Sequence, residues 1–338
     1  MLEYILTLFS GSVKTDMNTD KINTDDFNPA YYLAPMEGIT GYIYRNALRD
    51  HFGQGIKKYY TPFLVVHEKR AMSSKEINEI LPEHNEGLNL VPQILADDPD
   101  GFIRIEKKLK EFGYKEVNLN LGCPSKTVAS KGRGSGFLGR TEALDEFLYR
   151  IYENRVTDIS IKTRIGVSLP EEIYELLEIF NKYPVKELTI HPRVRYEYYK
   201  GQAHRDVFFR AFAESVNPVC YNGDVLSIKD IDELRRGTEN KLNAVMIGRG
   251  MLRDPSLIRS LSGGSSYSTD ELRAFLARLL HDYSEVLSGD RPVLQKMKEL
   301  WSYMQYSFPD KDKQIKSLLK CRSISEYRLL EMSVLSTR

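Results

Sequence analysis

The sequence has few cysteines, no long apolar run and almost no net charge. Its three cysteines, Cys123, Cys220 and Cys321, are odd in number and far apart, which fits neither a disulfide framework nor a CxxC zinc site. We therefore expect no metal site and a reducing compartment, the cytoplasm. No apolar run approaches the roughly 18 to 20 residues that span a bilayer. The apolar start carries Glu3 and no preceding basic residue, which is atypical of a signal peptide.

The charge is unevenly distributed along the 338 residues. The formal net charge of +1 by itself gives no sign of a polyanion partner. Residues 1–28, however, hold two Lys and five Asp or Glu, whereas residues 291–338 hold ten Lys or Arg and five Asp or Glu. The first segment is typical of a variable N-terminal extension. The basic end is either an ordinary solvated surface or a surface that binds a polyanion.

Eight short apolar runs between residues 30 and 250 predict β-strands. They cover residues 31–34, 59–66, 88–95, 116–121, 159–163, 187–190, 219–222 and 244–247. Amphipathic segments with helical periodicity lie between them, including residues 98–112, 142–153, 170–183 and 227–236. Eight strand and helix units over about 230 residues predict an α/β fold of the (β/α)8 TIM-barrel type. A doubly wound open sheet is the alternative.

The pattern changes to helices alone after residues 263–268 (GGSSYS), which predict a linker or tight connection. Ser268 and Glu271 form a capping-box signature at the start of a helix, and another helix is expected at residues 293–308. The sequence therefore divides into an N-terminal extension (1–28), a barrel domain (29–262) and a smaller all-helical C-terminal domain (263–338).

Polar residues and glycines gather where the predicted strands end. In a (β/α)8 barrel these ends and the loops that follow them form one mouth, which holds the active site. The residues in this position are Pro35, Met36, Glu37, Gln93, Asn120, Cys123, Lys162, His191, Asn222, Gly223, Asp224, Gly248 and Arg249. The glycines after strands seven and eight suit a phosphate, because backbone N–H groups can approach it closely there. Either loop alone is better explained as a tight turn, whereas the two together, in these two positions, favour a phosphate.

Two of these residues suggest specific chemistry. Lys162 lies in a strand whose alternate side chains face the barrel centre, where a buried ammonium needs an electron-rich ligand or a neighbouring carboxylate. Cys123 stands between a strand and a glycine-rich loop, and a thiol that is mostly protonated at neutral pH can donate a proton or act as a nucleophile. Residues 126–140 include four bases and no acid, which favours a phosphodiester above the site.

Seven segments of this chain resemble those of the tRNA-dihydrouridine synthases. They are YLAPMEGIT (32–40), VPQIL (91–95), NLNLGCPSKTVASKGRGSGFLG (118–139), SIKTRIG (160–166), LTIHPR (188–193), YNGDV (221–225) and AVMIGRG (244–250). The helical end matches the family's RNA-binding domain more loosely. The resemblance implies an FMN-dependent enzyme, a monomer, that reduces the C5=C6 bond of a flipped uridine in tRNA, with NADPH or NADH as the electron donor.

The resemblance also implies roles for individual residues. Cys123 is the expected general acid. The residues expected to hold FMN are Pro35, Met36 and Glu37 beneath the ring, Gln93 and Lys162 at its pyrimidine edge, and His191, Asn222, Gly223, Asp224, Gly248 and Arg249 at its ribityl phosphate, with Asn120 orienting the cofactor or the uracil. The residues expected to contact tRNA are Lys126, Lys131, Arg133, Arg193, Arg195, Lys200, Lys296 and Lys298.

The chain departs from the family pattern near Arg205, where a Trp is common, and this departure concerns the choice of uridine more than the chemistry. Two alternatives to the tRNA reaction stay open. An FMN barrel that acts on a free pyrimidine, as dihydroorotate dehydrogenases do, would not need the basic helical end. A relative that binds RNA without catalysis would not need Cys123, Lys162 and Arg249.

Overall fold

The computed structural model describes residues 27–67 and 72–336, so all but the last two residues of the expected N-terminal extension lie outside the described part. Its strands form one parallel sheet, in the order β3-β5-β6-β7-β8-β9-β10-β1-β2-β4. These strands are β1 (Ala30–Leu33), β2 (Ile56–Tyr60), β3 (Leu64–Val65), β4 (Leu90–Val91), β5 (Gln93–Leu95), β6 (Glu116–Leu121), β7 (Asp158–Gly166), β8 (Leu188–Val194), β9 (Val219–Tyr221) and β10 (Ala244–Ile247).

The sheet closes into the predicted eight-membered barrel. Two predicted strands are each interrupted once: residues 59–66 contain the end of β2 and all of β3, and residues 88–95 contain β4 and β5 on either side of Pro92. Proline has no backbone N–H for a continuous ladder. β2 pairs with β4 and β3 pairs with β5, and between these pairs Gln93 donates its backbone N–H to Thr61 Oγ1 at 2.9 Å. The β2–β4 pair and the β3–β5 pair, which stand at opposite ends of the strand order, are therefore two halves of one interrupted ladder. This ladder closes the barrel.

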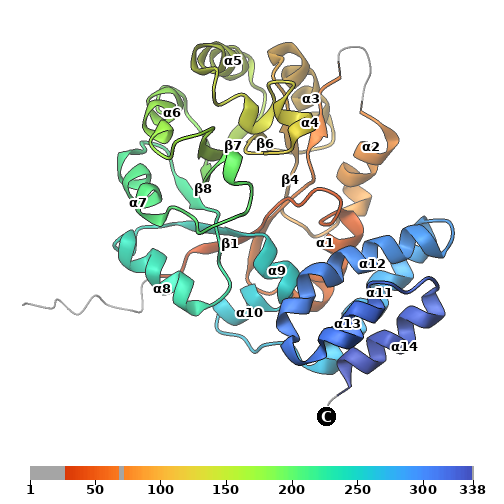
Figure 1. The fold of residues 1–338 in the computed structure, drawn as a ribbon. Helices are drawn as coiled ribbons and strands as arrows, with labels where there is room; N and C mark the ends of the chain where they lie inside the picture. Colours follow the sequence, from red (N-terminus) through yellow and green to blue (C-terminus); the bar gives the residue numbers. More distant parts are fainter. Residues whose placement is uncertain (1–26, 68–71, 337–338) are drawn as a thin grey trace, which may run out of the picture.

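Helices follow the strands and surround the barrel (Figure 1). They are α1 (Tyr42–Phe52), α2 (Ser74–Ile80), α3 (Pro99–Glu111), α4 (Lys126–Ala129), α5 (Thr141–Asn154), α6 (Glu172–Phe180), α7 (Arg205–Glu214), α8 (Ile228–Gly237), α9 (Arg249–Arg253) and α10 (Leu257–Leu261). The four predicted barrel helices are confirmed as α3, α5, α6 and α8. Asp98 begins α3 by accepting the N–H groups of Asp100 and Gly101, as an N-cap residue does.

β7 and β8 extend further than the sequence predicts. They end at Gly166 and Val194, so Lys162 lies in the middle of β7 and His191 lies inside β8 rather than after it. The prediction ended both strands where charged residues begin. In the barrel, a polar side chain can point inward while its backbone continues the ladder, and every residue of β8 is buried.

The C-terminal domain consists of α11 (Thr269–Val286), α12 (Asp290–Met304), α13 (Asp312–Leu318) and α14 (Ile324–Leu335), drawn in blue in Figure 1. The capping box is confirmed, because Ser268 Oγ accepts the N–H of Glu271. The second predicted helix begins earlier than expected and ends at Met304. Within residues 27–67 and 72–336, no helix combines the length and apolar character needed to cross a bilayer.

The helical domain packs directly against the barrel. The Phe275 ring of α11 lies edge-on to Phe52 and Tyr44 of α1, with ring centroids 5.4 Å and 6.0 Å apart. All three side chains are almost fully buried. The connection between the two parts is therefore an apolar interface as well as a stretch of chain.

Candidate active site

The expected site residues meet at the carboxyl end of the barrel, and side-chain contacts link them from strand to strand. Gln93 of β5 contacts Asn120 of β6. Arg193 of β8 forms an ion pair with Asp224, which follows β9, and Asp224 forms another with Arg249, which follows β10. Residues scattered over more than 150 positions of the sequence thus form one site.

A buried amide network fixes the side chains at β5 and β6. Gln93 Nε2 donates to Asn118 Oδ1 at 2.8 Å, and Asn120 Nδ2 donates to Gln93 Oε1 at 2.7 Å. Asn118 Nδ2 in turn donates to Ser160 Oγ at 3.0 Å. Each amide nitrogen carries two hydrogens, so Gln93 and Asn120 each keep one N–H for a ligand. Sequence reasoning did not identify Asn118 and Ser160, although their place in buried strands was a signal.

Asn120 also holds the loop that carries Cys123. Its Oδ1 accepts the backbone N–H groups of Gly122 and Cys123, both at 3.0 Å. On the other side, Ser135 donates its hydroxyl to the Cys123 carbonyl at 2.8 Å. Gly134 allows this approach: it has φ of +55°, and a Cβ there would lie 2.9 Å from the Cys123 carbonyl oxygen. The thiol therefore projects from a loop fixed at both ends.

The environment of Cys123 keeps its thiol protonated. Burial raises the pKa of Cys123, and this effect outweighs the hydrogen bond from the Ser125 backbone and the positive charges of Arg164 and Lys162, which lower it. A protonated thiol at neutral pH is a proton donor rather than a resting nucleophile.

Four cationic side chains surround a neutral histidine. Burial lowers the pKa of His191 well below its usual value, and the charges of Arg164, Lys162, Arg193 and Arg249 lower it further. Arg193 Nη1 lies 3.1 Å from His191 Nε2. Because a guanidinium only donates, Nε2 accepts and the imidazole proton lies on Nδ1. This concentration of positive charge favours an anion at the mouth.

Lys162 has no anionic partner. In the part of the chain that the structure describes, neither an ion pair nor a hydrogen bond reaches its ammonium group. Burial lowers the pKa of Lys162 to about 8, and the neighbouring charge of Arg164 contributes to this shift. The carboxylate that the sequence left open as an alternative partner is not found among the described residues.

Asp224, which the resemblance places at the phosphate, uses its side chain within the protein. Its two carboxylate oxygens form ion pairs with Arg193 and Arg249, so the carboxylate orients two cations. Arg205 supports the same loop by donating to the Asp224 carbonyl at 2.8 Å and by pairing with Asp230 at 2.7 Å. Arg205, at which the chain departs from the family pattern, therefore supports the loop that carries Asp224.

Two glycines bring the backbone close to this site. A Cβ at Gly223 would lie 2.2 Å from the Tyr221 hydroxyl, and one at Gly248 would lie 3.3 Å from Met36 Sδ. Asn222, directly before Gly223, uses its Nδ2 to donate to the Met246 carbonyl at 2.8 Å. The side chain of Asn222 thus joins β9 to β10, and the glycines leave room for a ligand.

Arg164 is a central residue that sequence reasoning did not identify. It is 1% exposed and donates to the carbonyls of Gly122, Val194 and Tyr198 at 2.9, 3.0 and 2.6 Å. It thereby joins the Cys123 loop to the loop after β8. The signal was available, because alternation along a strand places Arg164 on the same face as Lys162.

The residues expected to contact tRNA fall into two groups. Those with side chains open to solvent or half-buried at the rim are Lys126, Lys131, Arg195 and Lys200. The other four are already engaged within the protein. Arg133 pairs with Asp97 and Arg193 pairs with Asp224. Lys296 donates to the Gly38 carbonyl and Lys298 donates to the Cys321 carbonyl. Arg193 is 0% exposed, which places it with the anion site and not on an RNA-facing surface.

The fold and the site define a barrel enzyme whose polar residues converge at the carboxyl ends of its strands. The family model described as dihydrouridine synthase (Dus) matches residues 32–327, and the chain belongs to this family. It is accordingly an oxidoreductase.

Individual relatives agree with this assignment. The chain is 28% identical over 230 residues to tRNA-dihydrouridine synthase B of Pasteurella multocida (strain Pm70), covering 68% of this chain and 67% of the relative. It is 27% identical over 288 residues to a probable tRNA-dihydrouridine synthase of Staphylococcus aureus (strain COL), and this match covers 77% of this chain and 86% of the relative. Among solved structures, histamine dehydrogenase from Rhizobium sp. 4-9 has a TM-score of 0.52 at 12% identity, over 75% of this chain and 48% of that one. This last likeness concerns the fold alone.

Proposed function

We propose that this protein is an FMN-dependent tRNA-dihydrouridine synthase, which reduces the C5=C6 bond of a flipped uridine in tRNA with electrons from NADPH or NADH. The observation that carries the proposal is the closeness of two groups inside the barrel: the Cys123 thiol, which burial keeps protonated, and Lys162, a cation for which the described residues offer no anionic partner. The names of the relatives from Pasteurella multocida and Staphylococcus aureus support the same reaction.

The residues present fit FMN. The pyrimidine edge of its ring system presents oxygen and nitrogen acceptors, which match the Lys162 ammonium and the unused N–H of Gln93. Its phosphate matches the cations Arg193 and Arg249 beside the close backbone at Gly248. When bound, FMN supplies the hydride and takes up electrons from the nicotinamide.

The proton is the contribution of the chain itself. Reduction of C5=C6 adds a hydride at one carbon and a proton at the other, and the Cys123 thiol gives that proton and becomes a thiolate. Arg164 and Lys162 both favour the thiolate through their charge. Asn120, through its hydrogen bonds to the loop, keeps Sγ directed at the base.

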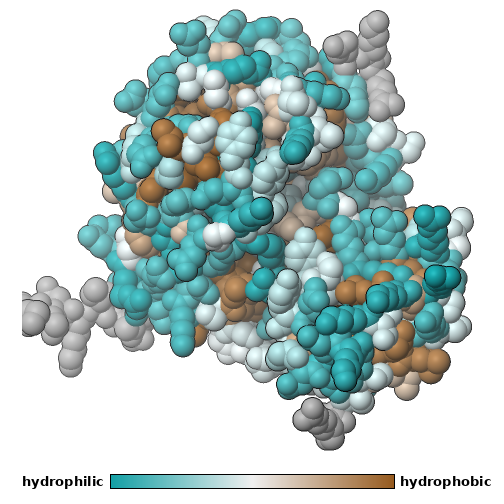
Figure 2. Space-filling model, viewed as in Figure 1, coloured by the Kyte–Doolittle hydropathy of each residue, from teal (hydrophilic) through white to brown (hydrophobic). Residues whose placement is uncertain are grey.

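The proposed partner is tRNA, bound by a monomer in the cytoplasm. The exposed bases Lys126, Lys131 and Lys200 stand near the mouth, where they can contact phosphates and offset the few kcal/mol needed to flip a base. In Figure 2 the surface of the helical domain is hydrophilic with hydrophobic patches between. This domain also has further exposed bases, namely Lys313, Lys316, Lys320, Arg322 and Arg328.

Purified protein tests the proposal in two steps. We expect a yellow protein, or a colourless one that becomes yellow with FMN, and dihydrouridine in unmodified tRNA after incubation with NADPH. A protein that cannot be loaded with FMN contradicts the redox assignment. Reduction of free uracil or orotate, with unmodified tRNA left unchanged, would instead favour the free-pyrimidine alternative.

A further inference from the structure

Helix α12 and the turn that follows it contact the loop after β1 and the end of helix α9, which follows β10. Lys296 of α12 donates from Nζ to the carbonyl of Gly38, in the loop between β1 and α1. In the turn after α12, Ser307 donates its hydroxyl to the Arg253 carbonyl at 2.9 Å, and the Tyr306 ring lies 4.4 Å from the Arg253 guanidinium. The helical domain thus touches the loop between β1 and α1 and the C-terminal end of α9, and α12 runs beside α9 in Figure 1.

The loop between β1 and α1 carries Pro35, Met36 and Glu37, which are expected beneath the flavin ring. Its inner side is held by Thr40, whose Oγ1 accepts the N–H of Met36 at 2.8 Å. Gly38 takes φ of +81°, so the chain turns sharply directly after Glu37. A shift of this turn would move Met36, whose sulfur packs close to Gly248.

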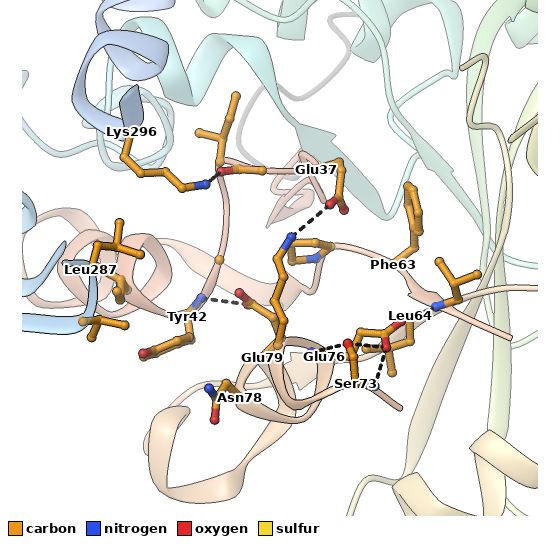
Figure 3. A pocket seen from close by; sticks show the side chains of 18 of the residues that line it. Glu37, Tyr42, Phe63, Leu64, Ser73, Glu76, Asn78, Glu79, Leu287 and Lys296 are labelled. Atoms are coloured by element: carbon orange, nitrogen blue, oxygen red, sulfur yellow. Dashed lines mark hydrogen bonds and ion pairs between the residues drawn. The ribbon is translucent and has the colours of Figure 1, made fainter. Parts of the chain in front are cut away.

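The outer side of the loop faces a cavity instead of a packed core. This cavity has a volume of 530 Å³ and lies between the barrel and α11 and α12, with Glu37, Tyr42, Phe63, Leu287 and Lys296 among its lining residues (Figure 3). Side chains bordering a void give the loop less support than close packing would. The hydrogen bond from Lys296 to the Gly38 carbonyl is a direct contact through which the helical domain holds this turn.

Charge keeps the Lys296 ammonium at this position. Glu299, one turn further along α12, would lie 3.6 Å from a Cβ on Gly38. Burial raises the pKa of Glu37, and the charges of Lys75 and Lys296 oppose this shift. Lys296 therefore interacts favourably with the Glu37 carboxylate as well as with the Gly38 carbonyl, and these interactions compete with any phosphate.

We propose that Lys296 is a positioning residue for the flavin site, through which the helical domain holds the loop of Pro35 to Glu37 in its cofactor-binding conformation. The inference rests on the proposed function, because it assumes that this loop binds FMN. It differs from the role expected from the sequence, in which Lys296 contacts tRNA. If Lys296 positions the loop, its loss lowers the affinity for FMN even when no RNA is present. If Lys296 only contacts RNA, its loss leaves the affinity for FMN unchanged.

Lys298 provides a matched control. It lies two positions further along α12 and carries the same charge, but it donates to the Cys321 carbonyl inside the helical domain. We expect Lys296→Ala to weaken FMN binding by about fivefold or more, the lower end of typical coupling between sites, and Lys298→Ala to stay within about twofold of the unmodified protein. The measurement is a titration of the full-length apoprotein with FMN, without RNA, followed by flavin fluorescence and visible circular dichroism.

Three further results decide the matter. Lys296→Arg keeps the charge and a donor, and is expected to recover most of the FMN affinity. If Lys296→Ala proves unstable in thermal unfolding, Lys296→Gln replaces it and should still bind FMN more weakly. A Lys296→Ala protein with unchanged FMN affinity and a raised KM for tRNA overturns the inference in favour of an RNA contact. Failure of the unmodified protein to bind any flavin contradicts the proposed function itself.

Discussion

The amide oxygen of Asn120 accepts the backbone N–H groups of Gly122 and Cys123 at the same distance, 3.0 Å. The nitrogen of the same amide donates to Gln93 at 2.7 Å. One side chain therefore connects the thiol loop to the strand that is expected to bind the flavin. The position of the Cys123 thiol therefore depends on Asn120, three residues earlier in the sequence, and on Gln93 of the neighbouring strand.

Replacement of Cys123 by Ala is expected to lower dihydrouridine formation by about 10²- to 10⁴-fold, the usual contribution of a positioned proton donor. FMN content should stay unchanged, because Cys123 is not among the residues expected to hold FMN. The measurement is single-turnover formation of dihydrouridine by the reduced enzyme, with flavin absorbance as the check on loading. Cys321→Ala, which removes a buried thiol of the helical domain, serves as the control. A Cys123→Ala enzyme with the full rate would exclude the proton-donor role.

FMN affinity is expected to fall as the pH rises through about 8. Burial holds the pKa of Lys162 in the free protein near that value, and an anionic or electron-rich ligand favours its charged form. Below this pH the ammonium is already formed, whereas above it binding must take up a proton, so Kd rises by up to about tenfold per pH unit. Titrations of the apoprotein with FMN between pH 6.5 and 9.5 measure this. Lys162→Met should bind FMN weakly, and its Kd should no longer rise with pH. The same slope in Lys162→Met would assign it to another group.

Loss of Asp224 is expected to destabilise the protein by about 2 to 3 kcal/mol, because it leaves the buried Arg193 without its carboxylate. Asp224 itself is partly exposed, which keeps the effect below that of a fully buried pair. Asp158 is the comparison, since its ion pair with Lys186 is more than half exposed at both ends and is worth at most about 1 kcal/mol. Urea unfolding of Asp224→Ala and Asp158→Ala measures both. Equal losses would show that Asp224 contributes no more than a surface ion pair.

Phe275 is expected to anchor the helical domain on the barrel. Phe275→Ala should lower stability by about 3 to 5 kcal/mol, as removal of a buried aromatic side chain does. Leu329→Ala, at a side chain that is 71% exposed, should change it by less than about 0.5 kcal/mol. Thermal and urea unfolding of both variants measure the difference. For the same reason, deletion of residues 263–338 should give an unstable barrel with Phe52 and Tyr44 exposed, and a stable truncated barrel would contradict this view of the interface.

Glu331 is expected to make stability fall as the pH rises from about 4.5 to about 7. Burial raises the pKa of this carboxyl to about 7, so in this range the folded protein holds a proton that the unfolded chain has released. Glu331→Gln should therefore be more stable than the unmodified protein at pH 8, by up to about 3 kcal/mol. The difference should disappear near pH 4.5. Unfolding curves at several pH values measure it, and a constant difference would exclude titration of Glu331 as the cause.

The barrel and most of the site could be predicted because their signals are local. Eight apolar runs separated by amphipathic segments indicate the fold, and residues such as Cys123 and Gly248 stand directly after strands. The prediction was less successful where polar residues continue a strand, as at His191. Side chains there point into a polar barrel centre, so hydropathy no longer marks the strand.

The sequence by itself determined the (β/α)8 barrel, the helical domain after it and the strand ends from which the site is built, since periodicity and turn residues act over a few positions. Only the tertiary structure decided what the charged side chains contact. Arg193 lies buried against Asp224, and Lys296 bonds a carbonyl 258 positions away. Such partners follow from how strands and helices pack, and no local pattern records them.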